Sequence, residues 1–198
     1  MGAEKRSNDN GLAWAFVAVL TALTVAYRLV PYLFNFSHDT QYLWNLTPVG
    51  ALALFAGARL RSRLAYLVPL VAMGLSDLLL VKLLADRGMR AFSWGTPVFY
   101  AAFMIEVAFG RLVRGRGAWW VGGAAVLGAT QFYLLSNFAV WLRGGYGWSA
   151  DGLLQCYVAG LPFYRNMLLG NLLYSGLFFG LYALTLHAVE RRKAEQPA

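Results

Sequence analysis

Six mostly apolar stretches run along this chain, each long enough, or nearly so, to be a helix that crosses a membrane. They cover residues 12–34, 42–58, 64–84, 96–113, 119–142 and 168–189. A membrane-spanning helix needs about 20 apolar residues to cross a hydrocarbon core of roughly 30 Å. No sustained alternation of apolar and polar residues, as in barrel strands, is present. The sequence therefore predicts an all-α fold, an integral membrane bundle of six transmembrane helices.

The composition supports this class. Of the 198 residues 59% are hydrophobic and only 13% are charged, whereas soluble domains have about a quarter charged residues. The net charge of +8 does not indicate nucleic-acid binding, because the basic residues occupy short loops between apolar stretches. Such loops are typical of topology signals and of contacts with anionic membrane lipid.

The basic residues also predict the orientation, with both chain ends in the cytoplasm. Eleven of the 17 lysines and arginines then lie inside, as the positive-inside rule requires. The expected organisation is a cytoplasmic tail over 1–11, a transmembrane domain over 12–189 and a second tail over 190–198. A long outer connection over 143–167 contains an apolar stretch too short to span, which is either a re-entrant lid or a tether on the membrane surface.

Polar residues inside the apolar stretches collect in the outer half of the predicted bundle. Buried polar groups are costly in a membrane, so a one-sided cluster indicates a water-accessible pocket for a small molecule. The candidate substrate-binding residues are Arg28, Asn45, Asp77, Glu106, Asn137, Trp141 and Asn166. Thr47, Lys82 and Asn171 fall in the same half or near it.

Each candidate also has a structural interpretation. Arg28 and Asp77 either orient a ligand or form an ion pair that holds two helices together. Glu106, without an evident partner of opposite charge, binds a cation, relays a proton or stays protonated against a neighbouring helix. Asn137 and Trp141 share a helix face and suit a flat heterocyclic ligand, but they are equally typical of interhelical hydrogen bonding and of the aromatic belt.

Catalytic motifs are absent from the sequence. It contains no zinc motif, P-loop or nucleophile elbow, and its single cysteine excludes an intrachain disulfide. We therefore expect a protein that is not an enzyme and needs no cofactor or metal. The alternatives to substrate capture are a stand-alone ion-coupled secondary transporter, in which Glu106 and Asp77 carry protons, and a non-catalytic membrane assembly factor.

Several short motifs resemble an uncharacterised family of bacterial membrane proteins labelled as transport proteins. They are the run Asn45 to Ala51, Pro69 with Ser76-Asp77, Ser136-Asn137-Phe138 with Trp141, Cys156-Tyr157 with Leu161-Pro162-Phe163, and Gly170-Asn171. The last motif more often reads Gly-Asp in that family, which places any charge-dependent role of Asn171 in doubt.

That family is in turn similar to the substrate-binding (S) components of energy-coupling factor transporters. The resemblance implies six helices in the bacterial cytoplasmic (inner) membrane, an outward-facing pocket and a vitamin-like substrate. It also implies a transmembrane coupling subunit, with ATPases, that docks on a stripe of small residues in the first helix. Ala18, Ala22 and Ala26 form such a stripe.

Overall fold

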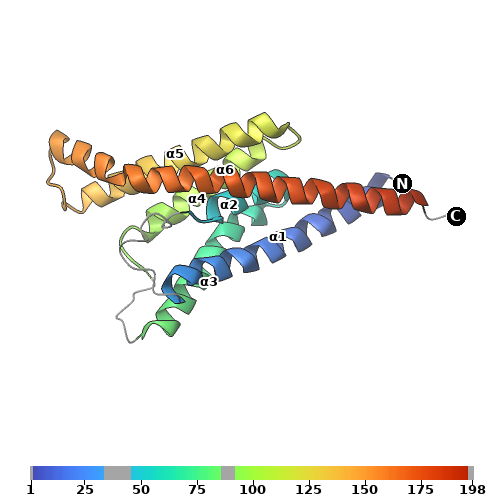
Figure 1. Ribbon diagram of the computed structural model, residues 1–198, viewed down its shortest axis with the longest axis horizontal. Helices are drawn as coiled ribbons and strands as arrows, with labels where there is room; N and C mark the ends of the chain where they lie inside the picture. The colour runs from blue at the N-terminus through green and yellow to red at the C-terminus, as the bar shows by residue number, and fades with distance from the viewer. Residues whose placement is uncertain (1, 34–45, 86–91, 196–198) are drawn as a thin grey trace.

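The computed structural model describes residues 2–33, 46–85 and 92–195, and they form helices without any strand. The α-helices are α1 (Gly2–Leu33), α2 (Val49–Arg59), α3 (Leu67–Leu83), α4 (Thr96–Leu112), α5 (Ala118–Leu142) and α6 (Ala150–Glu195), and a short 3-10 turn, η2 (Arg63–Tyr66), precedes α3. The two chain ends lie at the same end of the elongated molecule (Figure 1). The all-helical fold class is thereby confirmed.

Four helical stretches in these ranges are long and apolar enough to cross a membrane, which gives the chain the character of a membrane protein. They are Asn10–Leu33, Arg63–Leu83, Ala118–Leu142 and Ala150–Arg192. Two of the six expected segments are shorter, since α2 has 11 residues and α4 has 17. At 1.5 Å per residue α2 is only about 17 Å long, roughly half of a hydrocarbon core.

Helix α2 forms the centre of the bundle. Its residues from Val49 to Ala58 are all buried, and it packs against α1, α3, α4, α5 and α6. An apolar helix without a polar face is expected to be buried on all sides. Its small residues allow close approach: a Cβ atom on Gly57 would lie 3.1 Å from Cα of Gly110, and closer still to the carbonyl oxygen of Val107. Helices α2 and α4 therefore touch backbone to backbone.

An arginine from the α4–α5 turn caps the carboxyl end of α2. Arg114 donates hydrogen bonds to the carbonyl oxygens of Gly57 at 2.8 Å, Ala58 at 3.1 Å and Leu60 at 2.5 Å. These carbonyls have no partner within their own helix, and a cation is favourable at the negative end of the helix dipole. One of the basic residues assigned to topology therefore also fixes the position of the central helix.

The sequence expectation of a long connection between α5 and α6 was wrong. The connection expected over 143–167 is helical from Ala150, so only a short turn separates α5 from α6. Helix α6 has 46 residues, roughly 69 Å, and continues through Pro162. The residues from Gly2 to the start of the first apolar stretch belong to α1, and the cytoplasmic location of the tail over 1–11 stays a prediction. Proline removes one helix hydrogen bond, but helices packed on neighbours tolerate this loss.

Candidate functional site

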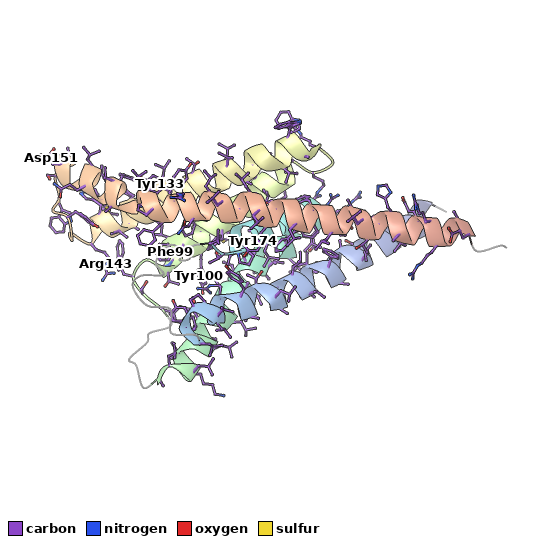
Figure 2. All side chains as sticks on the ribbon, in the orientation of Figure 1. Phe99, Tyr100, Tyr133, Arg143, Asp151 and Tyr174 are labelled. Carbon is purple, nitrogen blue, oxygen red and sulfur yellow. The ribbon has the colours of Figure 1, made fainter. Side chains whose placement is uncertain are left out.

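A cavity of about 440 Å³ lies where α1, α4, α5 and α6 are farthest from the chain ends. Along the long axis of the molecule, Phe99 of its wall lies between Arg143 in the α5–α6 turn and Tyr174 in α6 (Figure 2). Its aromatic lining residues are Tyr27, Tyr32, Phe99, Phe103, Phe132, Tyr146 and Phe163. Its polar lining residues are Arg28, Thr47, Ser136, Asn137 and Cys156. The cavity thus combines aromatic walls with a few hydrogen-bonding groups.

Arg28 lines the cavity and joins α1 to α3, and Asp77 extends the network to α4. Its guanidinium donates to a carboxylate oxygen of Asp77 at 2.8 Å, to the carbonyl oxygen of Met73 at 3.2 Å and to the hydroxyl of Ser76. The hydroxyl of Tyr100 donates to the second carboxylate oxygen of Asp77 at 3.4 Å. The side chains of Arg28 and Asp77 are only 17% and 14% exposed, so each neutralises a charge that the bundle would otherwise bury alone.

Asn137 lines the cavity from α5, at the point where α5 meets α6. Its amide nitrogen donates to the carbonyl oxygen of Tyr133 at 2.9 Å. A Cβ atom on Gly160 would lie 2.7 Å from Cγ of Asn137, so the glycine leaves the space that the amide fills. The thiol of Cys156 donates to the backbone oxygen of Asn137 at 3.3 Å. These contacts hold the amide at the cavity wall.

Three phenylalanines form part of the cavity wall. The ring centroids of Phe99 and Phe132 are 5.9 Å apart and their planes differ by 27°, which is a stacked arrangement. The rings of Phe103 and Phe132 are 4.9 Å apart. Because Phe99 and Phe103 are four residues apart on α4, they present one aromatic face to α5. A planar molecule can stack on such a surface.

The structure brings only some of the predicted residues together. Arg28 and Asn137 line the cavity, and Asp77 supports Arg28 from behind. Trp141 and Asn166 are not among the lining residues. Glu106 lies deeper than the cavity, and Asn45 lies outside the described residues.

Lys82 and Asn171 both lie away from the cavity. Lys82 is exposed at the end of α3, whereas Asn171 is buried against Glu106. The outer polar cluster expected from the sequence is therefore divided between a cavity, a deeper buried pair and the surface.

The aromatic wall and Gly160 were not among the predicted site residues. A sequence signal for them existed, because Phe132, Ser136 and Val140 recur at four-residue spacing and share one face of α5. Ser136 of this face was named from the sequence, whereas Phe132 was not considered. Within the described parts of the chain, no group of three histidine, cysteine, aspartate or glutamate side chains is placed to hold a metal ion.

The chain belongs to a family of unknown function (DUF6580), whose family model matches residues 8–195. Comparisons with curated proteins and with solved structures gave no match. The match covers every helix of the bundle, so the family shares the whole domain and not one motif. The function has to be argued from the cavity itself.

Proposed function

We propose that this chain captures a small, flat, vitamin-like molecule in the outer cavity for uptake across the membrane. The observation that carries the proposal is the cavity of about 440 Å³, with aromatic walls and several polar lining groups. Small-molecule sites in proteins are typically concave, largely apolar and roughly 300–1,000 Å³ in volume. The polar groups would fix the orientation of the ligand and the phenylalanines would contribute most of the contact area.

The electrostatics of the cavity favour a ligand without a strong net charge. Among the described residues, Arg28 is the only charged one in the lining, and its charge is already matched by Asp77. A strongly acidic or basic ligand would have to break that pair or bury an unmatched charge of its own. Neutral heteroaromatic molecules avoid this cost, because ring atoms stack on Phe132 while ring nitrogens or carbonyls bond to Asn137, Ser136 or Thr47.

For the membrane arrangement we propose six crossings, with both chain ends in the cytoplasm of a bacterial cell and the cavity facing outward. Two features support this. The two ends lie at the same end of the molecule, as an even number of crossings requires (Figure 1). The basic residues Arg59, Arg61, Arg111 and Arg114 also belong to helix ends and turns on the side away from the cavity. The short helices α2 and α4 would cross within the bundle, surrounded by longer helices.

A transmembrane coupling subunit with ATPases is the proposed partner. Between α1 and α3 runs an apolar groove of about 700 Å³, and Ala18, Ala22 and Ala26 form part of its lining. All three alanines are exposed, so the backbone of α1 is open to close approach by another helix. The partner helix would lie along this groove.

Replacing Ala22 with phenylalanine is expected to prevent partner docking without emptying the cavity. The ring would fill the groove, whereas the same change at Leu23, which is 60% exposed and outside the groove, would not. Co-purification of ATPase subunits with the tagged chain is the measurement. The Ala22→Phe chain should lose these subunits and Leu23→Phe should keep them; equal recovery with both variants would contradict the docking site.

Replacing Asn137 with leucine is expected to release a co-purifying ligand. The change removes the hydrogen-bonding group and keeps a similar volume, so about 1–3 kcal/mol of binding free energy should be lost, roughly 5- to 150-fold in affinity. Native mass spectrometry of the chain purified from its own membrane measures the ligand-bound fraction. The matched control is Gln155→Leu, which removes an amide from an exposed position of α6. Similar occupancy in both variants would overturn the assignment of the cavity.

The second candidate function is a stand-alone, ion-coupled secondary transporter. The buried carboxyl group of Glu106 favours it, since such groups frequently belong to proton pathways. Purified chain in vesicles would then take up the substrate in response to a proton gradient, with no ATPase present. Uptake that requires added ATPase subunits would instead support the capture proposal. The cavity itself argues against a purely structural assembly factor, for which a closed bundle would suffice.

A further inference from the structure

The centre of the bundle contains a buried carboxyl–amide pair that the cavity does not explain. Glu106 of α4 and Asn171 of α6 are each 1% exposed. The Asn171 side-chain nitrogen donates to Oε1 of Glu106 at 2.6 Å and also approaches the carbonyl oxygen of Ala125 at 3.3 Å. Gly50 of α2 and Gly128 of α5 complete the surroundings: a Cβ atom on Gly50 would lie 2.6 Å from Oε2 of Glu106.

Two oxygen atoms of this pair are buried without a hydrogen-bond partner. They are Oε2 of Glu106 and Oδ1 of Asn171. Both oxygen atoms lie close to the backbone of Gly50, because a Cβ atom on this glycine would contact both of them. An ionised glutamate and an amide oxygen can only accept, so the two atoms would repel each other and remain unsatisfied. An unsatisfied buried acceptor costs about 1–3 kcal/mol, and more when it is charged.

We propose that Glu106 binds a proton, and that this proton completes a reciprocal pair with Asn171. The carboxylic acid donates from Oε2 to Oδ1 of Asn171, while Oε1 accepts from the amide nitrogen. One proton thereby satisfies both orphan oxygens and removes the buried charge. The site is an intramembrane proton-binding site built from four helices, and it exists whether or not the outer cavity binds a molecule.

The surroundings of Glu106 exclude the usual alternative of a paired carboxylate. No basic side chain in the described part of the chain forms an ion pair with it. An isolated carboxylate at this depth would be very costly to bury. Exchanging the amide oxygen and nitrogen of Asn171 does not remove the need for a proton. It would place two oxygen atoms 2.6 Å apart, a contact that itself requires a shared proton.

An apolar layer separates the proton site from the cavity. Val49, Phe103 and Met167 belong to one buried cluster. Each precedes a residue of the proton site on its own helix by at most about one turn. The pairs are Val49 with Gly50, Phe103 with Glu106, and Met167 with Asn171. Val49 and Phe103 line the cavity, whereas Glu106 and Asn171 are not lining residues. The proton on Glu106 therefore stabilises the packing of α2, α4, α5 and α6 next to the cavity.

Infrared spectroscopy of the chain in lipid vesicles tests the proposal. At neutral pH the chain should show the C=O stretching band of a protonated carboxylic acid, and this band should be lost in Glu106→Gln. Glutamine can make the same two hydrogen bonds with Asn171, so this variant should fold. The matched control is Asp151→Asn, which removes an exposed carboxyl group and should keep the band.

A second variant tests the partner independently of Glu106→Gln. Asn171→Ala removes the acceptor for the proton, so the acid band should remain and shift to higher frequency. Absence of the band from the unmodified chain would overturn the proposal. So would a band that persists in Glu106→Gln, or one that does not move in Asn171→Ala.

Discussion

Replacing Gly57 with leucine should prevent the bundle from forming. The added side chain would meet the backbone of α4 at Val107 and Gly110, and backbone cannot rotate away as a side chain can. Overpacking a core costs about 1–3 kcal/mol when side chains can adjust, so we expect a loss of more than about 3 kcal/mol here. A protein domain has only about 5–15 kcal/mol of net stability. The yield of monodisperse protein and its thermal unfolding midpoint in mild detergent are the measurements.

Gly123 provides the matched control for this prediction. It lies on α5, it is exposed, and a Cβ atom there would meet nothing within 4 Å. Gly123→Leu should therefore change the unfolding midpoint very little, because the new side chain would face the membrane lipid. If Gly57→Leu and Gly123→Leu give equally stable protein, the backbone contact between α2 and α4 does not exist.

Removing either member of the Arg28–Asp77 pair should also lower the free energy of unfolding by a large amount. Breaking a buried pair by truncating one partner typically costs about 3–5 kcal/mol, because the remaining charge is left uncompensated. Arg28→Ala and Asp77→Ala should each lower stability by about this amount. The double variant should lose far less than the sum, because it leaves no buried charge. Additive losses in a double-mutant cycle of unfolding free energy would show that the two side chains do not interact.

A further variant, Asp77→Asn, separates the two roles that the sequence left open for Asp77. The carboxylate meets the guanidinium of Arg28 and the hydroxyl of Tyr100, and it is not a lining residue of the cavity. We therefore expect Asp77→Asn to lower stability more than ligand occupancy. A ligand lost from a fully stable Asp77→Asn chain would instead place Asp77 in direct contact with the ligand.

Sequence reasoning identified the features that depend on hydrophobic length. Apolar stretches and sparse charge predicted a helical membrane protein, and four helical stretches long enough to span confirm that class. The Arg28–Asp77 pair was named as one of two alternatives and is present. These successes share a cause, since the cost of burying polar groups in lipid restricts both helix length and the pairing of charges.

Sequence reasoning did not find the contacts that depend on which face each helix turns toward its neighbours. Glu106 and Asn171 are 65 residues apart, and only the arrangement of α4 and α6 around α2 and α5 shows that their side chains meet. The apolar stretch within 143–167 is too short to span alone and suggested a separate connection, yet α6 is continuous from Ala150 and packs against α5. The aromatic wall was missed for a different reason. Phenylalanine is as common in a core as in a binding site, so only the cavity separates the two roles.

A structure of the chain purified from its own membrane tests the central claim most directly. The account predicts density for a compact, planar molecule stacked on Phe132 and within hydrogen-bonding distance of Asn137, with the Arg28–Asp77 pair intact beside it. A cavity closed by its own side chains, or occupied by a lipid chain entering from the bilayer, would contradict capture of a small molecule.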